Sequence, residues 1–247
     1  MLESFCAGRL FAERVGSGPV EVVGLHGWAR TRADLIRALP GVSLLAFDLP
    51  GFGASPEPPA AWSTADYAEL LAEALGELDR PPVLAGHSFG GRVAVRLAAA
   101  RPEAVRGLVL AGVPFYRPDA PGTTPALAFR AARWAHRHGL LSERRMEELR
   151  QRYGSEDYRQ ARGIMREVLV RAVNESYADD IARITCPVEL VWGANDTAAP
   201  LEYARRASEV LPHSHLEVIE GGGHMSPVTA PDALRAAVGR LTSTSDR

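Results

Sequence analysis

A serine lies between two glycines in residues 86–90, which read GHSFG. The motif follows a short apolar run and precedes a stretch rich in Ala, Val and Leu, which indicates a tight strand-to-helix turn. Such a turn strains the central residue, so its neighbours two positions away must lack side chains, as Gly86 and Gly90 do. The alternative, a glycine-rich phosphate turn, requires G-x-G-x-x-G, which this stretch does not satisfy. We therefore expect Ser88 to be a nucleophile at a helix N-terminus.

A nucleophilic serine needs a general base, and the base needs a carboxylate that orients it. His224 follows three glycines, which we expect to let its loop approach the serine closely. Asp196 directly follows an apolar run and lies between Ser88 and His224, giving the chain order nucleophile, acid, base. We expect Asp196 to accept the imidazole proton. The alternatives are that Asp196 only caps the following helix, or that Asp119 is the acid.

Acyl transfer by such a serine also needs two N–H donors for the developing oxyanion. One is the amide of the residue after the nucleophile, Phe89, and the other comes from an early strand-to-helix loop. We expect the second to be the Trp28 amide, because Gly27 lets that backbone approach the site closely. The Trp28 side chain is then expected to shape the substrate pocket. We expect His26 to brace the loop by hydrogen bonding rather than to act as a second base.

The composition excludes several other chemistries. The chain has 28 basic residues, and every one of them is arginine. Without lysine there is no Schiff-base chemistry, no lysine general base and no lysine-dependent phosphate loop. Cys6 and Cys186 lie far apart and are expected to be reduced and buried, not to form a disulfide or a metal site. We expect no metal and no cofactor, because the chemistry above needs neither.

Short apolar runs supply the strands that must position these residues. They are continuously apolar and alternate with helical patterns, which is typical of a parallel sheet covered on both faces. The predicted strands span residues 20–25, 43–47, 82–85, 107–111, 187–192 and 216–219. The predicted helices include residues 63–78, 92–100 and 231–241. The sequence therefore predicts an α/β fold with a mostly parallel central sheet and helices on both faces.

The alternation breaks between the fourth and fifth predicted strands, where residues 114–184 carry helical patterns and no strand candidate. We expect a single domain over residues 1–247, with this segment as a helical cap at the carboxyl edge of the sheet, where ligands bind in open α/β folds. Residues 128–152 of the cap carry seven arginines against three glutamates. This basic region suits an acidic carrier protein or an anionic acyl substrate, or it is an ordinary solvated helix face.

Length, charge and hydropathy limit the partners and the location. The 247 residues are the length of one large domain or of one domain with an insertion. The net charge of −2 gives no overall field that attracts nucleic acid. No apolar run is long enough to span a bilayer, and residues 1–16 lack the basic start and apolar stretch of a secretory signal. We expect a cytoplasmic protein that binds neither nucleic acid nor a membrane.

Five motifs together resemble those of the α/β-hydrolase superfamily over nearly the whole chain. They are LHGW (25–28), DLPGFGAS (48–55), GHSFGGRVA (86–94), VWGANDTAAP (191–200) and GGGHMSP (221–227). The resemblance implies Ser88, Asp196 and His224 as a catalytic triad, with Trp28 and Phe89 as the oxyanion donors. Because the nucleophile is serine and not aspartate, haloalkane dehalogenase and epoxide hydrolase chemistry is not expected.

Two groups within the superfamily share particular features with this chain. The HGW loop and the short helical cap look like those of the pimeloyl-carrier-protein methyl ester carboxylesterases of biotin synthesis. The GGR at residues 90–92 looks like the menaquinone-synthesis lyase that forms a cyclohexadiene carboxylate, in which an arginine at the position of Arg92 helps to hold an anionic substrate. Phe89 replaces the more usual Leu or Met of both groups. The cap matches neither group closely enough to assign its residues to a substrate.

We expect a carboxylesterase-type serine hydrolase that cleaves a small or medium acyl ester through an acyl-enzyme. Trp28 and Arg92 are its expected substrate-binding residues, and an acyl carrier protein is a candidate partner. The first alternative is a triad-dependent lyase or carbon–carbon bond hydrolase on an anionic small molecule, in which no acyl-enzyme forms. The second is a ligand-binding protein without activity, which an intact triad disfavours. Thioesters, lactones and aminopeptidase substrates stay open.

Overall fold

One sheet of eight strands organises the computed structural model, which describes residues 1–116, 131–132, 134–153 and 156–243. The strands lie in the order β1-β2-β4-β3-β5-β6-β7-β8. They are β1 (Leu2–Phe5), β2 (Leu10–Val15), β3 (Val22–Leu25), β4 (Leu44–Asp48), β5 (Val83–His87), β6 (Gly107–Ala111), β7 (Val188–Gly193) and β8 (Ser214–Ile219). β3 to β8 pair in parallel, whereas β2 pairs antiparallel with both β1 and β4. Their carboxyl ends therefore meet at one edge, except at the antiparallel β2.

Helices follow most of the parallel strands. The helices of the described residues are α1 (Ala33–Ala38), α2 (Thr64–Leu75), α3 (Phe89–Ala100), α5 (Glu143–Tyr153), α6 (Glu156–Gln160), α7 (Gly163–Asn174), α8 (Ala178–Ile181), α9 (Leu201–Val210), α10 (Ser226–Thr229) and α11 (Asp232–Thr242). Two short 3-10 turns span Cys6–Gly8 and Pro102–Ala104. α2 begins at a capping box, in which the Ser63 hydroxyl and the Asp66 carboxylate bond each other's backbone amides.

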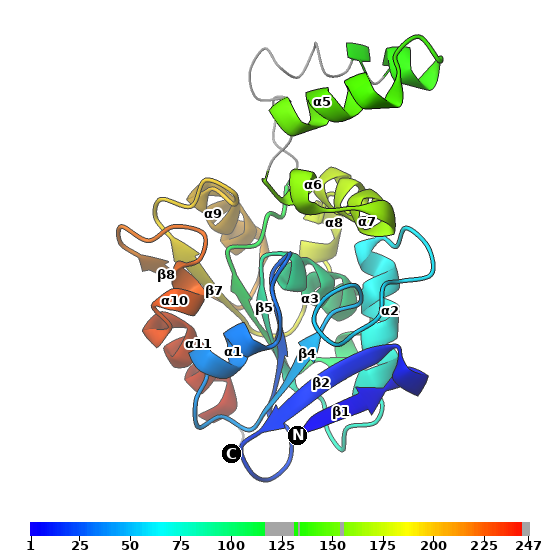
Figure 1. Cartoon of the computed structure of the whole chain (residues 1–247). Coiled ribbons are helices and arrows are strands. Elements are labelled where there is room, and N and C mark those ends of the chain that lie inside the picture. Colours follow the sequence, from blue (N-terminus) through cyan, green and yellow to red (C-terminus); the bar gives the residue numbers. More distant parts are fainter. Residues whose placement is uncertain (117–130, 133, 154–155, 244–247) are drawn as a thin grey trace.

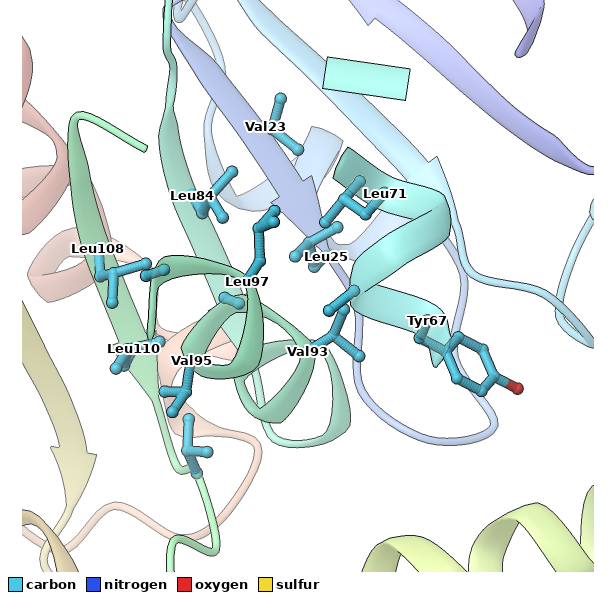
Figure 2. Close-up of a cluster of buried hydrophobic side chains, with 14 of the residues drawn as sticks. Val23, Leu25, Tyr67, Leu71, Leu84, Val93, Val95, Leu97, Leu108 and Leu110 are labelled. Carbon is cyan, nitrogen blue, oxygen red and sulfur yellow. The ribbon is translucent and has the colours of Figure 1, made fainter. Parts of the chain in front are cut away.

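The two faces of the sheet pack against different helices, which is why its strands are apolar on both sides. Alternate residues of β5 separate the faces: Val83 and Ala85 pack with α1 and α11, whereas Leu84 packs with α2 and α3. Figure 2 shows Leu84, Leu97 of α3 and Leu71 of α2 within one cluster, the larger of the two cores. Burying each such Leu or Val contributes roughly 1.5–3 kcal/mol relative to leaving it exposed.

The predicted α/β fold, with its mostly parallel sheet and helices on both faces, is confirmed. All six predicted strands are present within two residues of the expected ends. β1, at the edge of the sheet, and β2 beside it are not predicted, because both are only partly buried, with Phe5, Leu10 and Ala12 as their buried residues. Cys6 is buried but Cys186 is only partly so, and both are free thiols.

α5 to α8 occupy the chain between β6 and β7. α6 and α7 lie above the sheet, and α5 lies farther from it (Figure 1). α7 buries one apolar face, whereas α5 is joined to it by an ion pair between Arg166 and Glu147, at 3.1 Å. Of the helices in the described part of the chain, none is long and apolar enough to cross a membrane.

Two histidines are buried where strands of the sheet end. His26 follows β3 and His87 is the last residue of β5. Burial removes the water that would solvate an imidazolium, and it lowers the pKa of both side chains. For His87, burial and the nearby His224 lower the pKa to about 4. The folded protein thus keeps both rings neutral at neutral pH.

The buried histidines predict a loss of stability in acid. An unfolded histidine titrates at about pH 6.5, so between that pH and 4 the unfolded chain holds a proton at His87 that the folded chain excludes. As the pH is lowered through this range, His87 alone should reduce the free energy of unfolding by roughly 1.4 kcal/mol per pH unit. Urea unfolding at about pH 7 and pH 5 measures the slope.

The control for this prediction is the His87→Gln variant, which has no titrating ring at this position. Its free energy of unfolding should change less steeply with pH than that of the unmodified protein, whatever its absolute stability. Equal slopes in the two proteins would show that His87 is not the group that takes up the proton.

Candidate active site

Ser88 lies in the turn between β5 and α3, with left-handed backbone angles of φ 49° and ψ −109°. A Cβ on Gly90 would lie 2.4 Å from the carbonyl oxygen of Leu25, and one on Gly86 would lie 2.6 Å from the Cα of Gly91. Both obstacles are backbone atoms, which cannot turn away as a side chain can. The expected need for glycine on both sides of the serine is therefore confirmed, and its cause is contact with neighbouring backbone.

The structure brings Ser88, His224 and Asp196 into one line. Ser88 Oγ lies 3.0 Å from His224 Nε2, and His224 Nδ1 lies 2.8 Å from Asp196 Oδ2. The other carboxylate oxygen of Asp196 accepts the amides of Ala198 and Ala199, at 2.9 and 2.8 Å. With Asp196 accepting the Nδ1 proton, Nε2 is left as the acceptor for the serine hydroxyl. This arrangement can remove a proton from Ser88 as its oxygen attacks an electrophile.

Asp196 is buried and does not cap the following helix. α9 begins at Leu201, after Pro200, whereas the amides that Asp196 accepts belong to the turn before it. The same turn is held by Trp192, whose indole N–H donates to the Ala199 carbonyl at 2.7 Å. Asp119, the alternative acid, lies outside the described residues.

Two glycines that the sequence analysis did not single out let the acid and the base meet. A Cβ on Gly193, at the end of β7, would lie 2.5 Å from the carbonyl oxygen of Gly223. A Cβ on Gly112, after β6, would lie 3.1 Å from Asp196 Oδ2 and 3.3 Å from His224 Nδ1. The sequence shows each position as a glycine directly at a strand end, but it does not show which residues will lie against that glycine in the fold.

The loop that carries Trp28 is fixed by His26. Its Nδ1–H donates to the Gly27 carbonyl at 2.7 Å, and its Nε2 accepts the Leu49 amide at 3.0 Å. The prediction that His26 braces this loop is confirmed, because both ring nitrogens are engaged. Among the described residues, no acceptor bonds the backbone N–H of Trp28 or of Phe89.

An aromatic cluster packs behind the nucleophile. The Trp28 ring lies 5.0 Å from that of Phe52 and 5.2 Å from that of Phe89, and Tyr67 lies 5.2 Å from Phe89, all edge to face. A cavity of about 350 Å³ opens between Trp28, Phe52 and Met165 of α7. The sequence analysis placed Trp28 at a pocket but did not predict this aromatic cluster.

His87 is a site residue to which the sequence analysis assigned no role. It precedes the nucleophile, and its Nε2 lies 3.0 Å from the backbone carbonyl oxygen of His224. Its other ring nitrogen is buried and has no hydrogen-bond partner in the described part of the molecule. No signal in the sequence reveals this contact, because it joins residues 137 positions apart.

The guanidinium of Arg92 lies under the segment between β6 and β7. Its Nη1 donates to the Ala172 carbonyl at 2.6 Å, and its Cζ lies 5.7 Å from the centre of the Tyr177 ring. Burial lowers its pKa, and no carboxylate of the described residues forms an ion pair with it. Arg92 is therefore a buried cation that forms no ion pair in the described part of the chain, although the charge of Glu175 acts on it from beyond ion-pair distance.

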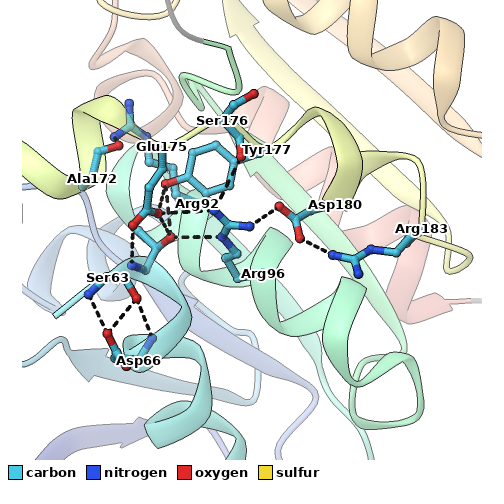
Figure 3. Close-up of polar contacts among 11 residues, drawn as sticks. Ser63, Asp66, Arg92, Arg96, Ala172, Glu175, Ser176, Tyr177, Asp180 and Arg183 are labelled. Carbon is cyan, nitrogen blue, oxygen red and sulfur yellow. Dashed lines mark hydrogen bonds and ion pairs between the residues drawn. The ribbon is translucent and has the colours of Figure 1, made fainter.

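Ion pairs and hydrogen bonds join the segment between β6 and β7 to helices α2 and α3 (Figure 3). Arg96 of α3 pairs with Asp180 at 2.5 Å and with Glu175 at 3.5 Å, and its Cζ lies 4.7 Å from the Tyr177 ring. Thr64, the first residue of α2, donates its hydroxyl to Glu175. These contacts link α2 and α3 to the chain that follows α7.

The site holds no metal-ligand cluster in the ranges that the structure describes. Of the basic region predicted in the cap, Arg137, Arg144 and Arg145 are exposed, whereas Arg130 and Arg133 lie outside the described residues. These three guanidinium groups are solvent-accessible, and Arg144 pairs with Glu148 at 4.0 Å.

Comparison with other proteins gives relatives along the whole chain. One is the pimeloyl-acyl-carrier-protein methyl ester esterase of Yersinia pseudotuberculosis, 27% identical over 248 residues, which cover 91% of this chain and 93% of the relative. A shorter match, 43% identical over 106 residues, covers 41% of this chain and 40% of the lipase LipV of Mycobacterium tuberculosis.

Solved structures share the fold. An esterase of Exiguobacterium antarcticum superposes with a TM-score of 0.74 at 21% identity, covering 98% of this chain and 99% of its own. The model of the alpha/beta hydrolase family matches residues 22–237, which include every strand from β3 to β8 and all three residues of the Ser88–His224–Asp196 line. This protein belongs to the alpha/beta hydrolase family.

Proposed function

We propose that this protein is a serine hydrolase that cleaves the carboxylic ester of a small or medium acyl substrate. The observation that carries the proposal is the continuous hydrogen-bonded line from Ser88 Oγ through His224 to Asp196. Relatives named as a methyl ester esterase and a lipase support an ester as the substrate. The family alone leaves the reaction open, because one fold hosts many chemistries.

The first half of the proposed reaction forms an acyl-enzyme. His224 Nε2 takes the hydroxyl proton as Ser88 Oγ bonds to the ester carbonyl carbon, and the carbonyl π electrons move onto its oxygen. The amides of Trp28 and Phe89 donate to that oxyanion, and Asp196 stabilises the imidazolium. The bond from carbon to the alcohol oxygen then breaks, and His224 returns its proton to the leaving alcohol. Water activated by His224 releases the acid in the second half.

We further propose that residues 1–247 form one domain and that residues 114–184 act as its cap. Support comes from the position of α6 and α7 above the sheet and from the cavity between Trp28, Phe52 and Met165. Pockets that take acyl groups are mostly apolar with a few polar groups, and this cavity combines Trp28, Phe52 and Met165 with Glu57 and Arg162. The exposed arginines of the cap suit an acyl carrier protein as partner.

A second candidate is a triad-dependent lyase or carbon–carbon bond hydrolase on an anionic small molecule. One observation favours it: Arg92 is a buried cation that forms no ion pair with a carboxylate of the described residues. A buried charge without a partner is costly, so an anionic ligand group near it would be stabilised. Binding of a substrate anion by Arg92 would serve an ester substrate equally, and the two reactions differ in whether an acyl-enzyme forms.

Covalent labelling tests the nucleophile. We expect a fluorophosphonate to add one adduct to the protein and none to the Ser88→Ala variant, as intact mass spectrometry would show. Turnover of p-nitrophenyl esters should fall on the order of 10⁴-fold or more in the variant, because attack and proton transfer are both lost. An adduct without ester turnover would favour the lyase; absence of any adduct on the unmodified protein would refute the serine mechanism.

A pair of aspartate variants tests the acid. Asp196→Asn should lower kcat by roughly 10³–10⁴-fold with little change in KM, because an amide N–H facing His224 Nδ1 stabilises the wrong imidazole tautomer. Asp119→Asn is the matched control and should retain full activity. A large loss of kcat in the Asp119 variant, with Asp196→Asn active, would move the acid to Asp119.

A further inference from the structure

Three loops that carry the proposed active site meet at one buried side chain, His87. It is the residue before Ser88, its Nε2 bonds the backbone of the base, and Gly27 of the Trp28 loop lies against its other edge. We propose that His87 is a positioning residue, whose Nε2–H fixes the carbonyl of His224 and thereby holds the imidazole in line with Ser88. This inference rests on the proposed function, because it assigns a role within the same site.

The contacts of the His87 ring identify which of its two nitrogens donates the hydrogen bond. The distance from His87 Nε2 to the His224 carbonyl oxygen is 3.0 Å, and a carbonyl can only accept, so Nε2 carries the proton. Nδ1 is then an unprotonated nitrogen, and it faces Gly27, where an added Cβ would lie 2.9 Å away. The His87 ring is thus enclosed between the base loop and the Trp28 loop, with a single donor directed at the base.

The loop that carries the base, residues 220–226, needs such a donor because its glycines can adopt many backbone conformations. Residues 221–223 are all glycine, and Gly221 has a left-handed φ of 68°. The Asn195 amide bonds the Gly222 carbonyl at 2.7 Å, and Ser226 Oγ accepts the Gly223 amide at 2.8 Å. Among the described residues, it is His87 that donates a hydrogen bond to the backbone carbonyl of His224 itself. Without it, the backbone carbonyl of His224 has no donor among the described residues, and the base is held through its ring and through the backbone bonds of its neighbours.

The neutral state of His87 suits the reaction. When His224 becomes an imidazolium, a second positive ring with its centre 5.0 Å away would repel it. Burial keeps the pKa of His87 low, so the neutral ring donates its hydrogen bond without competing for the proton that His224 must take. A lysine or arginine at this position would supply the donor but also the repulsion.

A matched pair of variants separates the hydrogen bond from packing. Gln keeps an uncharged N–H donor at about the reach of His Nε2, whereas Met has a similar size and no donor. In His87→Met we expect kcat for a p-nitrophenyl ester to fall roughly 10–100-fold at nearly unchanged KM, because misplacement of the base slows chemistry and not binding. In His87→Gln we expect kcat within about threefold of the unmodified protein.

Hydrogen exchange of the base loop gives a readout that does not need activity. Amides of residues 220–226 should exchange faster in His87→Met and at the original rate in His87→Gln, measured by mass spectrometry with Tm recorded for both. Equal losses of kcat in the two variants, or full kcat with unchanged exchange in His87→Met, would overturn the inference. Absence of fluorophosphonate labelling on the unmodified protein would refute the serine mechanism separately, and the exchange contrast would still decide whether His87 positions the loop.

Discussion

The left-handed backbone of Ser88 is the constraint around which the site is arranged. A non-glycine residue in such a conformation costs roughly 1–3 kcal/mol, so the surroundings must hold it there. The Ser88 amide donates to the Ala111 carbonyl at the end of β6, at 2.9 Å, and the Gly90 amide donates to the His26 carbonyl after β3, at 3.0 Å. The strained turn is thus bonded to both strands that flank β5, in the middle of the sheet. Most of the close approaches in the site follow from that placement.

Local patterns allowed most of the fold to be predicted, because a buried strand is apolar on both faces and can be recognised from five or six residues. The same holds for the GHSFG turn and for the loop of His224, whose glycines lie beside the functional residue in the chain. Gly112 and Gly193 could not be assigned, since what they contact comes from segments far away in sequence. His87 is the extreme case: the motif contains it, but its only described polar contact is with a residue 137 positions away in the chain.

The segment above the sheet is anchored to α2 and α3 by the residues that follow α7. Arg96, Thr64 and Glu175 form a compact polar network with Tyr177 beneath α7 (Figure 3). Farther out, α5 has a buried Met146 and its ion pair to α7. A segment built in this way can change its outer helices without disturbing the register of β6 with β7, on which the acid turn depends.

The order of the strands bears on how heating separates Ser88 from His224. Ser88 follows a central strand, whereas His224 follows β8, which lies at the border of the sheet and pairs with β7. Border elements open at lower free energy than central ones, often reversibly. For any chemistry that needs both side chains, we expect heating first to detach His224 from a nucleophile whose own turn is still intact. We expect inactivation to begin at β8 and cooling to reverse it until the central strands also separate.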